Sequence, residues 1–172
     1  GDCVVYWMIS ARRSNYNLTL EHAIHLATQK SLPLVVVEPL AIAHKWANDR
    51  SHTFVIQGMM DNKKSFEDSP ITYIPYVETK PNEARGLLEK WIENASVLVV
   101  DDFPVYHPRK VMEIAVSLNK CEVHCVDSNG FISMRPGREF TTAYSLRRHL
   151  HKSIIQHMSE FPSKNPIKNA IG

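Results

Sequence analysis

Glycine is scarce in this 172-residue chain, and glycine-rich phosphate loops are missing. The six glycines form neither a G-x-G-x-x-G fingerprint nor a Walker loop, the two patterns that bring backbone amides close to a pyrophosphate. We therefore do not expect a Rossmann dinucleotide site or a P-loop.

Cysteine is equally sparse, and long apolar runs are missing. The three cysteines are an odd set, more typical of reduced intracellular thiols than of a disulfide framework. No apolar run approaches the roughly 20 residues that span a bilayer, and no basic-then-apolar leader precedes the first extended segment. The sequence predicts a cytoplasmic protein that makes no membrane contact.

Patterns for metal or hydrolytic chemistry are also lacking. Cys121, His124 and Cys125 lie close together, but in an extended segment His124 points to the face opposite the two thiols, and no fourth ligand is near in sequence. The nine histidines form no H-E-x-x-H pair, and no serine sits in a nucleophile elbow. We expect no metal site and assign no catalytic residue.

What the sequence does contain is an alternation of strand and helix patterns. Short segments rich in valine, isoleucine and aromatic residues are expected to form strands: Cys3 to Met8, Leu34 to Val37, Ile71 to Val77, Val97 to Val100 and Val123 to Val126. Several are continuous apolar runs, as in strands covered on both faces. We predict an α/β fold: a Rossmann-like, doubly wound, five-stranded parallel sheet with helices on both faces.

Helical patterns fill the intervals between these strands. Asn17 is placed to cap the first helix, Pro81 precedes the third, and Pro108 opens the fourth. The apolar faces expected to be buried are Leu20, Ala23, Ile24 and Ala27; Phe54, Val55, Gly58 and Met59; Ala84, Leu87, Leu88, Trp91 and Ala95; and Val111, Met112, Ala115 and Leu118.

The pattern changes after the fifth strand. Asn129 and Gly130 form a tight-turn pair before another short extended piece, and Thr141 or Thr142 caps a last helix. Between Arg135 and Lys152 the sequence has five lysines or arginines and a single acid, Glu139. A basic helix of this kind contacts phosphates, is solvated, or docks against a following domain. We favour the docking interpretation. We divide the chain into an α/β domain (1–134), a helical segment (135–160) and a linker or tail without periodicity (161–172).

Polar residues at the expected strand ends are the candidate site. In open parallel sheets, ligands bind beyond the carboxyl ends of the strands. Arg12 and Arg13 either clamp a planar or anionic group or pair with carboxylates of neighbouring loops. Asp101 and Asp102 point to opposite faces, which is unsuitable for a cooperating acid and base pair. We interpret one as a ligand acceptor and the other as a loop cap or salt-bridge partner, with a purely structural role for both equally open.

Several segments together resemble the amino-terminal α/β domain of the DNA photolyase and cryptochrome family, in particular its class II-like members. The resemblance runs from Cys3 to about Lys152 and is distributed over "VVYWMISARRSNYNLTLEHAIHLA", "PLVVVEPL", "RSHTFVIQGMMDN", "YIPYVE", "VVDDFP", "VDSNGFI" and "TAYSLRRHLHK".

This resemblance implies an antenna-type domain for a light-harvesting chromophore: a deazaflavin, a folate or a second flavin. The residues expected to contact the chromophore are Arg12, Glu38, Pro39, Leu40, Arg50, Phe54, Asp102 and Phe103. In the family, the catalytic FAD, the electron-relay tryptophans and the dimer pocket belong to a helical domain that follows. We therefore expect that helical FAD-binding domain as a partner, damaged DNA as a partner of the full-length protein, and no activity from this segment alone.

The function implied by the resemblance is light-dependent repair of pyrimidine dimers by a parent photolyase, a carbon-carbon lyase. Two alternatives stay open. One is a cryptochrome-type photosensory or interaction module. The other is a free-standing Rossmann-like nucleotide-binding protein, such as a stress protein or an electron-transfer flavoprotein subunit.

Overall fold

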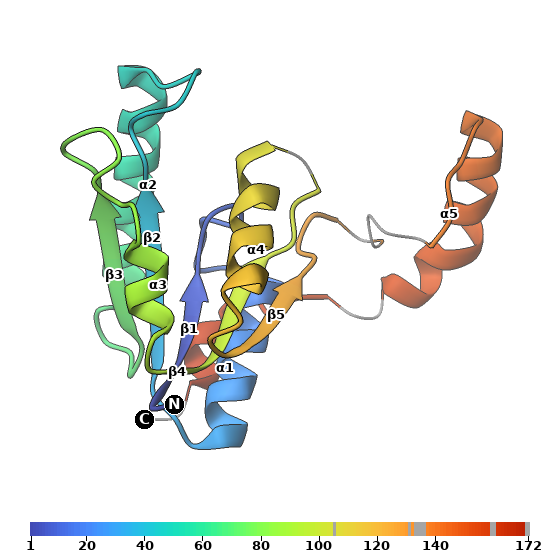
Figure 1. Cartoon of the computed structure of the whole chain (residues 1–172). Helices are drawn as coiled ribbons and strands as arrows, with labels where there is room; N and C mark the ends of the chain where they lie inside the picture. The colour runs from blue at the N-terminus through green and yellow to red at the C-terminus, as the bar shows by residue number, and fades with distance from the viewer. Residues whose placement is uncertain (105, 131, 133–136, 159–160, 171–172) are drawn as a thin grey trace.

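A five-stranded parallel sheet forms the centre of the protein (Figure 1). The structure is a computed structural model that describes residues 1–104, 106–130, 132, 137–158 and 161–170. The elements are β1 (Cys3–Trp7), α1 (Leu18–Lys30), β2 (Leu34–Leu40), α2 (Asp49–Phe66), β3 (Thr72–Val77), α3 (Leu87–Ile92), β4 (Ala95–Asp101), α4 (Tyr106–Leu118), β5 (Glu122–Val126), α5 (Ala143–His157) and the 3-10 helix η1 (Pro166–Asn169).

The strand order is β3-β2-β1-β4-β5, and every neighbouring pair is parallel. The chain therefore moves outward from β1 in both directions, and the order reverses between β1 and β4. The predicted doubly wound α/β fold is confirmed. The reversal also fixes where ligands are expected, because loops on either side of it diverge at the carboxyl ends of the strands.

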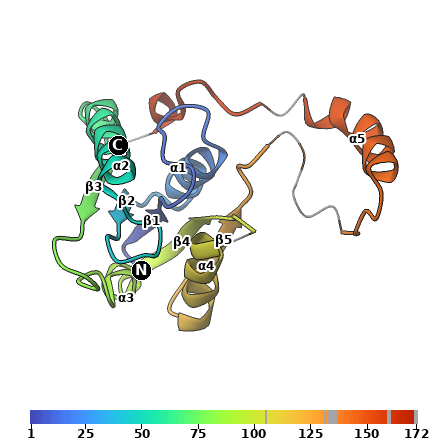
Figure 2. The ribbon, with the colours of Figure 1, turned by 90° about the horizontal axis from the view of Figure 1, so that it is seen from above.

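Two apolar cores cover the two faces of the sheet. Along β1, Val4 and Tyr6 pack against α1, whereas Val5 and Trp7 pack on the opposite face with residues of α3 and α4. This alternation follows from the two-residue period of a strand. Figure 2 shows the sheet from above, with α1 and α2 on one side and α3 and α4 on the other. The prediction of helices on both faces is confirmed.

The start of α1 is fixed by the predicted cap. The Asn17 side chain accepts a hydrogen bond of 3.0 Å from Leu20 N, which satisfies an amide that has no partner inside the helix. The helix ends where Ser31 adopts a left-handed conformation and donates its N–H to Ala27 and Thr28 carbonyls. The face expected to be buried is buried in the structure.

Several details of the predicted helix faces were wrong; Ala84, expected on the third helix, precedes α3, which begins at Leu87. Phe54, expected on the buried face of α2, is 77% exposed, whereas Met59 is buried. The buried side of α2 consists of Met59, Asn62 and Phe66, because only the later turns of α2 lie against the sheet. Ala95, expected on the third helix, instead begins β4, because α3 ends at Ile92.

The last helix stands apart from the sheet (Figure 1). Thr142 caps it as predicted, accepting a hydrogen bond of 3.2 Å from Ser145 N, and none of its residues is buried. Arg135 and the extended piece expected after Gly130 fall largely outside the described residues. Within the described ranges, no helix combines the length and apolar character needed to cross a bilayer.

The tail after α5 returns to the α/β body. Tyr16 N donates to Ser163 O at 3.1 Å, and Ser163 N donates to Glu21 Oε2 at 3.2 Å. Pro166 is buried, and Ile167 packs against the core cluster of α1. Interpreting 161–172 as a linker did not anticipate these contacts, because a short apolar segment without helical period can still cover a helix.

Candidate functional site

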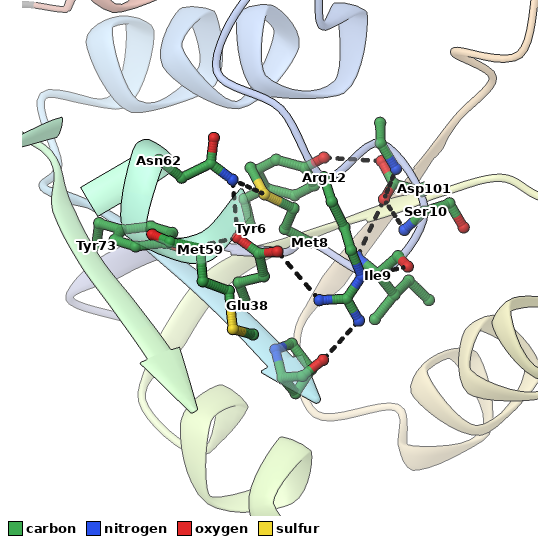
Figure 3. Close-up of polar contacts among 12 residues, drawn as sticks. Tyr6, Met8, Ile9, Ser10, Arg12, Glu38, Met59, Asn62, Tyr73 and Asp101 are labelled. Atoms are coloured by element: carbon green, nitrogen blue, oxygen red, sulfur yellow. Dashed lines mark hydrogen bonds and ion pairs between the residues drawn. The ribbon is translucent and has the colours of Figure 1, made fainter. Parts of the chain in front are cut away.

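Asp101 organises the loop that follows β1. Its Oδ2 accepts three backbone hydrogen bonds, from Ile9 N (3.1 Å), Ser10 N (2.8 Å) and Ala11 N (3.0 Å). Its Oδ1 accepts a hydrogen bond of 2.8 Å from the Tyr6 hydroxyl, and the residue is 2% exposed. Figure 3 shows the Asp101 carboxylate beside Ile9 and Ser10 of this loop. Successive amides converging on one anion form the kind of concavity that binds phosphate in other folds; here the chain fills it with its own carboxylate.

Asn17 joins this loop to α1. Besides capping the helix, its Nδ2 donates to the Ala11 and Arg13 carbonyls, each at 2.9 Å. Asn17 is fully buried, and its hydrogen bonds are satisfied by the loop that it closes. The loop after β1 is therefore a rigid structure, and its glycine-free sequence fits this role because no phosphate has to approach the backbone.

Arg12 forms the second polar centre, together with the end of β2. Its Nη1 lies 3.1 Å from Glu38 Oε1, its Nη2 donates to Pro39 O at 2.6 Å, and its Nε donates to Ile9 O at 3.2 Å. All three nitrogens of the guanidinium thus bind acceptors of the chain itself. The Arg12 side chain is still 24% exposed.

Glu38 is a buried carboxylate with partners on three elements. Its Oε2 accepts hydrogen bonds from Tyr73 Oη at 2.6 Å and Asn62 Nδ2 at 2.9 Å, while its Oε1 faces Arg12. A carboxylate that is 1% exposed needs such partners, because burying an unpaired charge costs several kcal/mol. Burial, reinforced by Glu38, raises the pKa of Tyr73, so this hydroxyl remains a donor. Glu38 ties α2 and β3 to the end of β2 (Figure 3).

The structure brings some of the predicted contact residues together and separates others. Arg12, Glu38 and Pro39 are joined by hydrogen bonds, with Leu40 buried beside them at the end of β2. Arg50 and Phe54 are exposed on α2. Asp102 and Phe103 lie beyond β4, where Asp102 N donates to Val126 O at 2.8 Å and Asp102 O accepts from Asn129 Nδ2 at 2.6 Å. The predicted set therefore does not form one cluster: four residues, Arg12 included, lie together, two are exposed on α2 and two follow β4.

Of the two adjacent aspartates, Asp101 is the loop cap. Arg13 donates from Nε and Nη2 to Tyr16 O at 3.2 and 3.0 Å, so this arginine stabilises a turn of the same loop. Pairing with a carboxylate, one of the two interpretations of the arginines, is what Arg12 shows with Glu38, whereas Arg13 binds a backbone carbonyl of its own loop.

Sequence reasoning did not assign Asn62 or Tyr73 to the site, and it placed Gly58 on the buried face of the second helix. Gly58 lies four residues before Asn62, hence on the same side of α2 and one turn nearer the carboxyl edge of the sheet. A Cβ placed at Gly58 would meet no heavy atom within 4 Å, so the helix surface here faces open space. The sequence did carry one sign of this open surface: a glycine in a helix interior, which lowers helix stability by about 1 kcal/mol relative to alanine.

No metal centre is assembled by the described part of the chain. Its His, Cys, Asp and Glu side chains form no group of three or more arranged to hold an ion. His124 instead contacts His22 and Glu122. Burial raises the pKa of the Cys3 and Cys121 thiols, which lowers their reactivity as thiolates.

Sheet order, cores and polar edge define a doubly wound α/β domain, and comparison with known proteins adds a relative. No family model matches the sequence. The chain is 33% identical over 101 residues to the deoxyribodipyrimidine photo-lyase of Methanothermobacter thermautotrophicus. The match covers 59% of this chain and 22% of that protein, so the matched segment spans about a fifth of the relative's length.

The fold is shared with solved structures of very different sequence. The structure of the universal stress protein from Archaeoglobus fulgidus has a TM-score of 0.50 to this chain, with 13% sequence identity, and the match covers 74% of this chain and 99% of that one. At such low identity the likeness describes the α/β architecture alone.

Proposed function

We propose that the chain is the amino-terminal α/β domain of a photolyase-like protein, which in full length repairs pyrimidine dimers in DNA by light. The observation that carries this proposal is the 33% identity to a photo-lyase over 101 residues. The domain holds an antenna chromophore at the carboxyl edge of its sheet and supports a helical domain with the catalytic FAD. No residue of this domain acts in dimer cleavage.

The structure of the loop after β1 favours a flat chromophore rather than a nucleotide as the ligand. The three amides of residues 9–11 that would hold a phosphate already bind Asp101. On α2, which contributes Asn62 to the Glu38 network, the ring of Phe54 is exposed and the surface at Gly58 is open, and Arg12 is partly exposed. A deazaflavin, folate or flavin ring binds such a surface by stacking and a few hydrogen bonds, without phosphate contacts.

The antenna proposal is tested by titrating the 172-residue protein with 8-hydroxy-5-deazaflavin, riboflavin and methenyltetrahydrofolate while fluorescence is recorded. We expect one of the three to bind with a spectral shift. Gly58→Leu fills the open surface and should weaken binding about tenfold or more, the effect of about 1.4 kcal/mol, while Gly58→Ala should change it less. If no probe binds, or if the Gly58→Leu variant binds as well as the wild type, the proposed chromophore site is contradicted.

The exposed helix α5 supports the second role, which is attachment of the helical domain. Its side chains include exposed apolar residues and a basic set without any acid between Ala143 and His157. The apolar members are Tyr144, Leu146, Ile154 and Ile155, exposed by 65, 40, 36 and 76%. Exposed apolar area of this kind is typical of interaction surfaces. We propose that α5 packs on the helical domain and lies near the path of damaged DNA.

Repair assays separate this proposal from its alternatives. The 172-residue protein with FAD and light should not repair ultraviolet-damaged DNA, whereas the parent protein should. Turnover by the segment alone shows that the chemistry has been misplaced, and a light-responsive parent without repair favours a cryptochrome-type sensor. Tight ATP or AMP binding by the 172-residue protein favours the nucleotide-binding alternative, against which the Asp101 contacts argue.

A further inference from the structure

A chain of ionisable side chains joins α1 to β5, on the side of the domain away from the candidate chromophore site. The Nε2 atom of His22 lies 2.9 Å from Nδ1 of His124; the ring centroids are 5.0 Å apart and the rings are inclined by 36°. The Nε2 atom of His124 lies 2.8 Å from Glu122 Oε1, and Lys30 Nζ lies 3.5 Å from Glu122 Oε2.

This geometry fixes the protons of the two imidazoles at neutral pH. The His124 contact and Lys30 lower the pKa of Glu122, so Glu122 is a carboxylate and His124 Nε2 must carry the hydrogen that it donates. A neutral His124 then has a lone pair at Nδ1. His22 Nε2 must carry the hydrogen of the bond between the rings.

The pair accommodates one added proton and not two. A first proton on Nδ1 of His22 leaves both hydrogen bonds in place. A second proton must go to Nδ1 of His124, so both nitrogens of the 2.9 Å contact then carry hydrogens and neither can accept. The bond between the rings is lost, and two imidazolium cations face each other.

The surroundings bias the pair toward its neutral form. His25 and Lys30 on α1 add positive charge, while Glu122 on β5 is negative; Cys125 and Asp127 line the same shallow hollow on the β5 side. Burial, His124 and His25 lower the pKa of His22. Because the folded state binds a proton on His22 less readily than the unfolded chain below the ordinary histidine value of 6.5, the native state loses stability as the pH falls through that range. The bond between the rings itself is lost when the second proton binds.

We propose that His22 and His124 form an acid-sensitive clamp that fastens the edge strand β5 to α1. Among the described strands, β5 ends the sheet and pairs with β4 alone, so a contact with α1 helps to hold it. A contact between α1 and the segment just after β5 does not titrate: Thr19 N and Thr19 Oγ1 lie 3.1 and 3.0 Å from Ser128 Oγ. Acidification therefore loosens the histidine contact and leaves the Lys30–Glu122 and Thr19–Ser128 contacts in place.

Amide hydrogen exchange of the 172-residue protein tests the clamp, with protection factors compared at pH 7.5 and pH 5.0. In the wild type, β5 amides should lose about five- to tenfold more protection than β1 amides at the lower pH, the effect expected for one hydrogen bond. His22→Gln should abolish this difference, because an amide both donates and accepts. His25→Gln, a nearby histidine outside the pair, should retain it, and Ser128→Ala should lower β5 protection equally at both pH values.

Long-range proton-nitrogen NMR spectra of the imidazoles give a second readout that does not depend on stability. At pH 7.5 we expect the Nε2-protonated tautomer for His124. A His124 protonated at Nδ1, equal pH responses of β5 and β1 in the wild type, or loss of the response in His25→Gln as in His22→Gln would each overturn the proposal.

Discussion

Tyr6 of β1 and Asp101 of β4 bind each other in the interior, with Tyr6 Oη donating to Asp101 Oδ1 at 2.8 Å. Burial and the nearby carboxylate raise the pKa of Tyr6 well above its usual value, so the hydroxyl remains a donor. The other oxygen of Asp101 holds the loop after β1. This one side chain therefore links two central strands to the loop at the proposed chromophore site.

Asp101→Asn should lower the free energy of unfolding by about 2–4 kcal/mol, because an amide group presents a donor where backbone amides need a charged acceptor. Denaturant unfolding followed by circular dichroism measures the change. Asp61→Asn is the matched control: its side chain is 81% exposed, and we expect a change within about 0.5 kcal/mol. Equal losses for the two variants would contradict the role given to Asp101.

Arg12 and Glu38 should be strongly coupled in a double-mutant cycle of Arg12→Met and Glu38→Gln. Removing Arg12 alone leaves a buried carboxylate with a missing cation, at a cost of about 3 kcal/mol, and the double variant should recover at least about 1 kcal/mol of the summed losses. The exposed pair Arg109 and Glu113, at 2.9 Å, serves as control with a coupling of about 0.3–0.5 kcal/mol. Additive losses at Arg12 and Glu38 would show that the pair contributes nothing specific.

Two glycines should respond to alanine with opposite sign. Gly58 lies in a helix interior with open space before it, so Gly58→Ala should stabilise the protein by about 1 kcal/mol. Gly86 has a φ of +75°, where a side chain is strained, so Gly86→Ala should destabilise it by about 1 kcal/mol. Thermal unfolding of both variants checks the signs; a loss at Gly58 would mean that the surface there is not open.

The returning tail should matter for stability more than α5 does. Ile167→Ser removes an apolar contact with the core around α1 and should cost about 1–2 kcal/mol. Ile155→Ser changes a side chain that is 76% exposed and should stay within about 0.5 kcal/mol. Urea unfolding of the 172-residue protein compares them. A larger loss at Ile155 would show that α5 is packed in solution against the same chain.

The fold could be predicted from the sequence because its central strands are unusually explicit. β1 and β4 are buried on both faces and are therefore continuous apolar runs, and Asn17 and Thr142 are residues with a physical reason to start a helix. The exposed position of Phe54 could not be predicted, since the pattern shows which residues share a helix face and not how far the helix extends past the sheet.

The site was only partly predictable, because its contacts join distant parts of the chain. Asn62 and Tyr73 lie 24 and 35 positions from Glu38, and a single sequence carries no sign of that pairing. Strand-end position pointed to Arg12, and the family resemblance pointed to Glu38. Neither showed that they bind each other, or that Asp101 closes the loop.

The return of the tail also has a mechanical consequence. The excursion that carries α5 leaves the body near Asn129, which bonds Asp102 O at 2.6 Å, and rejoins it at Ser163, which bonds Glu21. A force applied to α5 is therefore transmitted to two places, the segment after β4 and helix α1. A partner bound to α5 would therefore act on the α/β domain through two attachments and not through a free chain end.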